Sequence, residues 1–150
     1  MVEQSEIERT PAILSVSPLD TDHLSLEAII GGSSVTLLKA HDLVSARSLL
    51  QHFDIAAVVC ERDLMPGTWM DMLEDIKAMP NPPSLIVASR LADDRFWVEA
   101  LNLGAWDVVA KPFDTSGVMR SVKSGRQHWH DQDDASQVNQ TEQQQAATAA

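Results

Sequence analysis

The amino-acid sequence predicts an α/β fold with five parallel strands in one doubly wound sheet. Five short apolar runs recur along the chain, and an amphipathic segment follows each of them. Continuous apolar runs are typical of parallel strands, because helices cover such a sheet on both faces. Strands that alternate with helices imply right-handed crossovers, and sites in such folds lie at the carboxyl ends of the strands. We therefore expect functional residues just after the strands.

Each element can be placed in chain order from its composition. Strands are predicted at residues 12–16, 35–38, 55–60, 85–88 and 108–110. Apolar residues at helical spacing follow every run and predict a helix there. The helix ends carry their own signals: Thr68 and Asp71 resemble a capping box, residues 81–83 close the third helix, and Asp114 suits an N-cap. The pattern thus gives five repeats of strand and helix.

Composition divides the chain into three parts. Residues 11–130 contain all five repeats, whereas residues 1–10 are expected to form a flexible extension. Residues 131–150 are rich in Gln, Ala, Ser and Thr and have almost nothing apolar to bury, so a disordered tail is predicted. One domain with two tails is the expected organisation.

Charge and hydropathy exclude two classes of partner. The net charge is −11, and −5 remains on residues 11–130 after both tails are set aside. Such a body repels the phosphate backbone of nucleic acids, which proteins bind through Lys and Arg. No apolar run approaches the roughly 18 residues of a membrane helix, and residues 1–10 lack the pattern of a secretory signal. We expect a cytoplasmic protein without nucleic-acid or membrane partners, in which the single cysteine, Cys60, lies in the core.

The last third of the chain carries a recognisable pattern. Ser89 follows the fourth strand, Leu103-Gly104-Ala105 ends a helix, and Lys111-Pro112-Phe113 closes the fifth strand. This pattern resembles the CheY-like receiver domains of two-component response regulators, over about residues 11–130. The resemblance implies the flavodoxin-like (βα)5 receiver fold. It also implies that Ser89 is the hydroxyl switch residue, that Lys111 is the pocket lysine, and that the Lys111–Pro112 peptide bond is cis.

The positions of the acidic pair depart from the family. Receivers usually have two adjacent acids after the first strand, and Ser17 and Pro18 stand there. Mg²⁺ is held in proteins by carboxylates together with phosphate oxygens and water. We therefore predict that Mg²⁺ binding is lost or weak and that no cofactor is bound. Asp20 and Asp22 lie nearby, but Asp is favoured where a helix begins, so both are expected to cap the first helix.

The acceptor loop departs from the family as well. Alignment on Gly67 puts Glu61 at the position of the accepting aspartate, whereas alignment on Pro66 puts Arg62 there. Asp63 would have to shift by two residues to serve. The longer side chain of Glu61 can reach the place of an aspartyl phosphate and act as a fixed partner of Lys111. The other interpretation is that Glu61 is a solvated acid at a strand end.

Two further positions concern signalling. Val108 stands where the family usually has an aromatic switch residue, which predicts a blunted switch. Trp97 and Trp106 fall on the face formed by the fourth helix, fifth strand and fifth helix, which receivers use for partners and dimers. Tryptophan is enriched in interfaces, although core packing would also explain each residue.

Two function classes remain open. The first is a stand-alone, non-enzymatic pseudo-receiver of a two-component phosphorelay, which binds a protein through the fourth-helix to fifth-helix face without conventional aspartyl phosphorylation. A histidine kinase and a second copy of the chain are the candidate partners. The second is a genuine phospho-acceptor with a rearranged acidic pocket, in which a histidine kinase phosphorylates Asp63 or Glu61.

Overall fold

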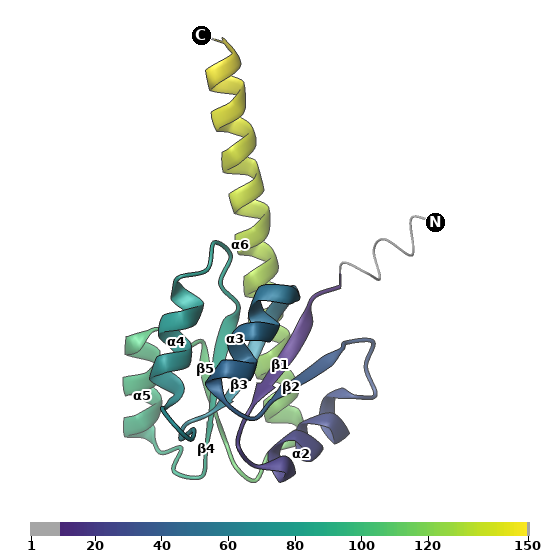
Figure 1. The fold of residues 1–150 in the computed structure, drawn as a ribbon, viewed down its shortest axis with the longest axis vertical. Coiled ribbons are helices and arrows are strands. Elements are labelled where there is room, and N and C mark those ends of the chain that lie inside the picture. Colours follow the sequence, from purple (N-terminus) through teal and green to yellow (C-terminus); the bar gives the residue numbers. More distant parts are fainter. Residues whose placement is uncertain (1–9, 150) are drawn as a thin grey trace.

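Five parallel strands form one sheet at the centre of the structure, a computed structural model that describes residues 10–149 and the side chains of residues 10–135 (Figure 1). The strands and helices alternate in the order β1 (Ala12–Val16), α2 (Asp20–Ile30), β2 (Leu37–Ala40), α3 (Leu43–His52), β3 (Ile55–Glu61), α4 (Trp69–Lys77), β4 (Ser84–Ser89), α5 (Asp94–Leu103), β5 (Asp107–Ala110) and α6 (Thr115–Ala149). The strand order across the sheet is β2-β1-β3-β4-β5. The predicted doubly wound, five-stranded parallel sheet is confirmed.

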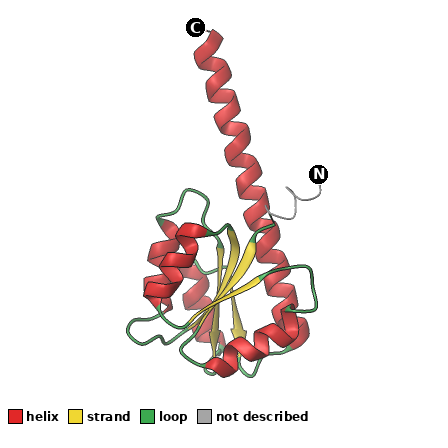
Figure 2. Cartoon of the chain, turned by 45° about the vertical axis from the view of Figure 1, so that its right-hand side comes forward, coloured by secondary structure: helices red, strands yellow, loops and turns green. Residues whose placement is uncertain are grey.

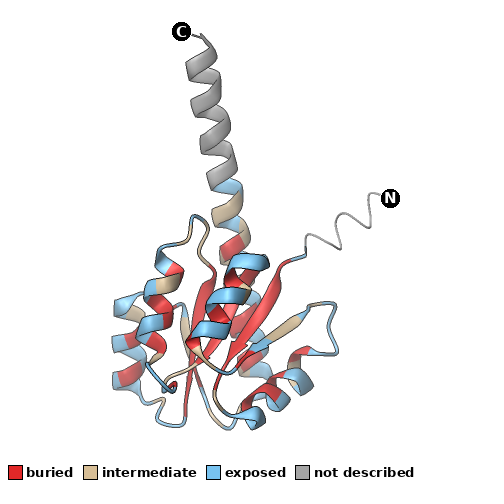
Figure 3. Ribbon diagram, in the orientation of Figure 1, coloured by how far each residue is buried: buried red, intermediate tan, exposed pale blue. Residues whose placement is uncertain are grey.

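Helices cover both faces of the sheet, as Figure 2 shows. One core cluster packs α3, α4 and α5 against alternate residues of the central strands, with Leu14 and Val58 at its centre. The other packs α2 and α6 against the intervening residues, such as Ile13 and Val59. The central strands are therefore buried on both faces (Figure 3). This explains why they appear in the sequence as continuous apolar runs.

The strand bounds differ from the predictions mainly at the edge of the sheet. β1 has the predicted bounds, whereas β2 begins two residues later than predicted and extends to Ala40. β2 is an edge strand and is only partly buried, so it accommodates the exposed Lys39 that interrupts the apolar run. The capping box of Thr68 and Asp71 is confirmed, and Asp114 accepts a hydrogen bond from the backbone N–H of Gly117.

Helix α6 corrects the prediction of a disordered tail. The helix continues through residues 131–149 and extends beyond the sheet (Figures 1 and 2). Gln, Glu and Ala favour helix, and no Gly or Pro follows Gly125 to end it. The composition of this segment shows that it has little to bury, which does not prevent it from being helical. The predicted flexible extension lies outside the described residues except for Thr10. Across the described part of the chain, no helix combines the length and the hydropathy required to span a membrane.

Candidate functional site

Lys111, Asp22 and Glu61 meet at the carboxyl edge of the sheet. Lys111 follows β5 and donates a hydrogen bond of 2.8 Å from Nζ to Oδ2 of Asp22. The same ammonium forms an ion pair with Oε2 of Glu61, the last residue of β3. The lysine side chain is only 5% exposed, and those of Asp22 and Glu61 are 11% and 12% exposed. We call these three residues the charged triad.

Asp22 is the residue of the triad that sequence reasoning placed wrongly. Asp20 and Asp22 were predicted to cap the first helix, but the N-cap is Leu19, which makes no side-chain capping bond. Asp22 lies on the same buried face of α2 as Leu26 and Ile30, so its carboxylate turns toward the sheet. Asp20 faces outward and pairs with His41, with 2.6 Å between Oδ1 and Nε2. The spacing of Asp22, Leu26 and Ile30 was the sequence signal that could have found it.

Ser17 supports the carboxylate of Asp22. Its hydroxyl donates a hydrogen bond of 2.6 Å to Oδ2 of Asp22 and accepts one of 3.1 Å from the backbone N–H of Leu19. Ser17 is buried, and Pro18 follows it without adding a polar group. Positions 17 and 18 thus contribute a hydroxyl to the pocket, and Asp22 supplies a carboxylate from the neighbouring helix.

Electrostatics within the triad keep Lys111 charged. Burial by itself would lower the pKa of the lysine, but its hydrogen bonds to Asp22 and Glu61 and the negative charges of these carboxylates outweigh this effect, so the pKa is raised. Oε2 of Glu61 is buried and makes no other hydrogen bond within the described residues. The ammonium is therefore committed to both carboxylates.

Asp63, the alternative acceptor, does not reach the triad. It is exposed in the loop after β3, where its backbone forms an isolated bridge with Thr68. Arg62 separates it from Glu61 and places its guanidinium 4.4 Å from the centre of the Phe96 ring. The structure thus brings Glu61 to the pocket and leaves Asp63 outside it.

The two predicted switch positions lie on neighbouring strands, Ser89 at the end of β4 and Val108 within β5. Ser89 ends β4 and is buried, and its hydroxyl accepts a hydrogen bond of 3.0 Å from the backbone N–H of Leu91. Val108 is half-buried in β5 and packs against the α3, α4 and α5 side of the core. The Lys111–Pro112 peptide bond is cis, as the resemblance implied.

These residues do not fit a divalent cation of the kind that the family implies. Positions 17 and 18 provide no carboxylate, and each carboxylate of the triad has one oxygen paired with Lys111. Ser17 directs its proton, rather than a lone pair, at Asp22. Across the part of the chain whose side chains are described, no three His, Cys, Asp or Glu residues are grouped as metal ligands.

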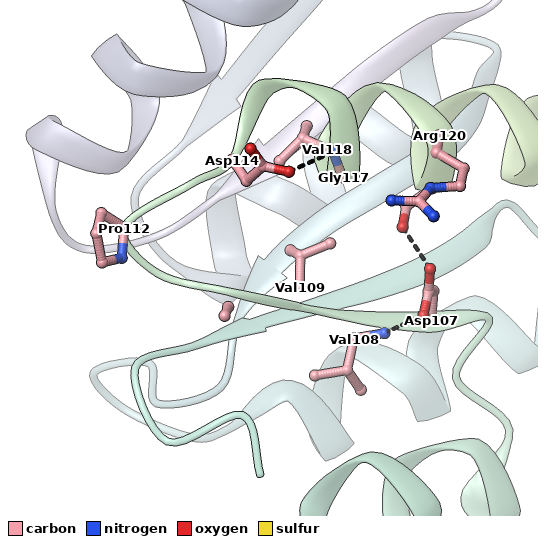
Figure 4. A pocket seen from close by; sticks show the side chains of 10 residues that line it. Asp107, Val108, Val109, Pro112, Asp114, Gly117, Val118 and Arg120 are labelled. Carbon is pink, nitrogen blue, oxygen red and sulfur yellow. Dashed lines mark hydrogen bonds between the residues drawn. The ribbon is translucent and has the colours of Figure 1, made fainter. Parts of the chain in front are cut away.

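Trp97 and Trp106 lie on the face formed by α5, β5 and α6, where they are 45% and 36% exposed. Asp107 at the start of β5 accepts hydrogen bonds from the Trp97 indole, at 3.3 Å, and from the hydroxyl of Ser121 on α6. Trp106 donates to Ser124 at 2.9 Å. An adjoining hollow of about 340 Å³ lies between β5 and α6. Figure 4 shows the residues that line it, with Asp107 at one end and Pro112 at the other.

Comparison with known proteins places this geometry in context. No protein-family model matches the chain. Over 84 residues it is 31% identical to the sensory transduction protein LytR of Staphylococcus saprophyticus, covering 56% of this chain and 32% of that protein. The chain spans about a third of the length of the curated relatives that it matches.

Solved structures agree on the architecture. The signal receiver domain of an HD domain-containing protein from Pseudomonas fluorescens Pf-5 matches with a TM-score of 0.75 and 22% identity, over 84% of this chain and 93% of that one. The receiver domain of a LuxO repressor protein from Vibrio parahaemolyticus matches with a TM-score of 0.74 and 17% identity, over 82% and 95% of the two chains. The chain therefore has the fold of the response-regulator receiver domains.

Proposed function

We propose that the chain is a receiver-like signalling module of a two-component system that acts by binding a protein, without conventional aspartyl phosphorylation. The likeness to LytR and to solved receiver domains supports the two-component context. The charged triad is the observation that carries the rest of the proposal. A module of this kind is not an enzyme, and it would work in the cytoplasm, where soluble receivers meet their kinases.

Phosphoryl transfer needs a nucleophile that a donor can reach and cations that stabilise the charge of the transition state. In the triad, the buried Oε2 of Glu61 contacts the ammonium of Lys111. A donor at this oxygen would have to displace an ion pair that is already buried. The same ammonium is shared with Asp22, so it is not free to stabilise an incoming phosphoryl group. In the triad, the candidate nucleophile and the cation are thus already paired with each other.

The partner surface in this proposal is the α5, β5 and α6 face. It exposes two tryptophans and three aliphatic or thioether side chains, namely Trp97, Val98, Leu103, Trp106 and Met119. Aromatic residues and Met are enriched in the cores of protein interfaces. A histidine kinase and a second copy of this chain are the two partners to test there.

The proposal is tested by incubating the wild-type protein with Mg²⁺ and acetyl phosphate and measuring its intact mass. We expect no added phosphoryl group. A matched control restores the family's chemistry with Ser17→Asp, Pro18→Asp and Glu61→Asp together, and this variant should gain one group. A phosphoryl group on the wild type would refute the proposal. If Asp63→Asn then removed that group, the exposed Asp63 would be the acceptor and the second function class would hold.

A further inference from the structure

His23 is a buried imidazole directly next to the charged triad. It lies in the first turn of α2 and is 3% exposed. Nε2 lies 2.9 Å from the carbonyl oxygen of Ser17, and Nδ1 lies 2.8 Å from Oγ of Ser15. A carbonyl can only accept, so Nε2 carries the proton and Nδ1 of the neutral ring accepts the hydroxyl proton of Ser15. The neutral tautomer satisfies both ring nitrogens.

The bonds of His23 continue into the triad through Ser17. The carbonyl of Ser17 accepts from His23, while its hydroxyl donates to Oδ2 of Asp22. That same oxygen accepts from Lys111, which is paired with Glu61. An unbroken series of contacts thus runs from the histidine to the end of β3.

A proton on Nδ1 is incompatible with this arrangement. The imidazolium has two donors and no acceptor, so the hydroxyl of Ser15 would have to rotate. A positive charge would also appear at a buried position, which is costly unless an anion compensates it. Burial accordingly lowers the pKa of His23, and the hydrogen bond to Ser17 opposes this.

The charged groups around the ring identify the anion that would respond. From α2, Asp22 and Asp20 favour the imidazolium, whereas His41 after β2 disfavours it. The rings of His23 and His41 lie 4.8 Å apart, edge to face, and His41 is exposed and already paired with Asp20. The carboxylate shared with Lys111, that of Asp22, is therefore the one available to His23.

We propose that His23 is the input of the pocket, and that its protonation at Nδ1 draws Asp22 away from Lys111 and opens the charged triad. A proton would then take the place that a phosphoryl group has in receivers. This inference rests on the proposed function, because it supplies the input of a module that is not phosphorylated.

An NMR titration of the wild-type protein from pH 8 to pH 5 tests the inference. The ring signals of His23 and His41 are followed separately, and the midpoint of His23 should lie below the ordinary 6.5. We expect the backbone amides of Ser17 and Asp22 and the ammonium of Lys111 to shift with the midpoint of His23. The inference is overturned if they follow the midpoint of His41 or do not shift.

Two variants sharpen the result. In His23→Gln the amide can still donate to Ser17 but cannot titrate, so the shifts at Asp22 and Lys111 should disappear. In the matched control His41→Gln they should persist. Shifts that persist in His23→Gln refute the inference. If that variant fails to fold, the inference is judged from the wild type alone, by whether the shifts follow the ring signal of His23 or that of His41. The phosphodonor experiment tests the proposed function separately, because a phosphorylated wild type with intact His23 coupling refutes only that proposal.

Discussion

Replacement of Lys111 by Met should reveal how strongly the triad is coupled. The variant removes the ammonium and leaves two carboxylates, each about nine-tenths buried, facing each other. Removal of one partner of a buried ion pair costs about 3–5 kcal/mol of unfolding free energy, because an uncompensated charge remains. Glu61→Gln alone should cost about 1.5–3 kcal/mol, the value of a hydrogen bond to a charged group. In the Lys111→Met background, the same change relieves repulsion and should cost little or stabilise.

Urea unfolding followed by far-UV circular dichroism measures all four proteins of this double-mutant cycle. We expect a coupling energy of about 1–3 kcal/mol between Lys111 and Glu61. Lys39→Met is the matched control, because Lys39 pairs with Glu27 in an exposed contact and should cost no more than about 1 kcal/mol. Effects that add to within about 0.5 kcal/mol, or equal costs at Lys111 and Lys39, would show that the triad is not an interacting unit.

Three further results follow from the same residues. Titration with millimolar Mg²⁺ should leave the fluorescence of the buried Trp69 unchanged. A saturable change would show that the pocket binds Mg²⁺ and would contradict this prediction. Burial, with a smaller effect of Glu61, raises the pKa of the Cys60 thiol, so a disulfide reagent should modify it only on unfolding; fast reaction of the native protein would contradict this. Because the pKa of His23 is lowered on folding, the unfolded chain binds the proton more readily than the folded chain. The free energy of unfolding should therefore fall as the pH drops below about 6.5, by at most ~1.4 kcal/mol per pH unit. An unchanged pH profile in His23→Gln would assign that loss to other groups.

The strands could be predicted from the sequence most accurately where the sheet is fully buried. β1 lies between two strands and two layers of helix, so every residue of it is apolar or small, and its bounds could be predicted. β2 has one free edge, and Lys39 there breaks the pattern without breaking the strand. Residues 131–149 include almost no apolar residues apart from alanines, so no periodicity marked the helix that the backbone forms.

The site was predictable only where its residues follow strands. Glu61 ends β3 and Lys111 directly follows β5, so the topology of the parallel sheet brings them to one edge. Asp22 reaches the same edge from the buried face of α2, and an Asp in the first turn of a helix is usually interpreted as a capping residue. His23 gave no signal either, because a lone histidine beside apolar residues is compatible with many environments. Both depend on side-chain direction, which local composition does not fix.

The charge balance of the pocket shows that Lys111 alone does not compensate the buried carboxylate of Asp22. The triad holds two carboxylates and one ammonium, which leaves one negative charge in excess. Asp22 lies in the first turn of α2, where the unpaired N–H groups and the helix dipole favour a negative charge. The hydroxyl of Ser17 adds a donor at the same oxygen. The excess charge is thus stabilised by the helix terminus and by Ser17. Loss of either contribution should displace the carboxylate of Asp22 before it lowers the stability of the fold.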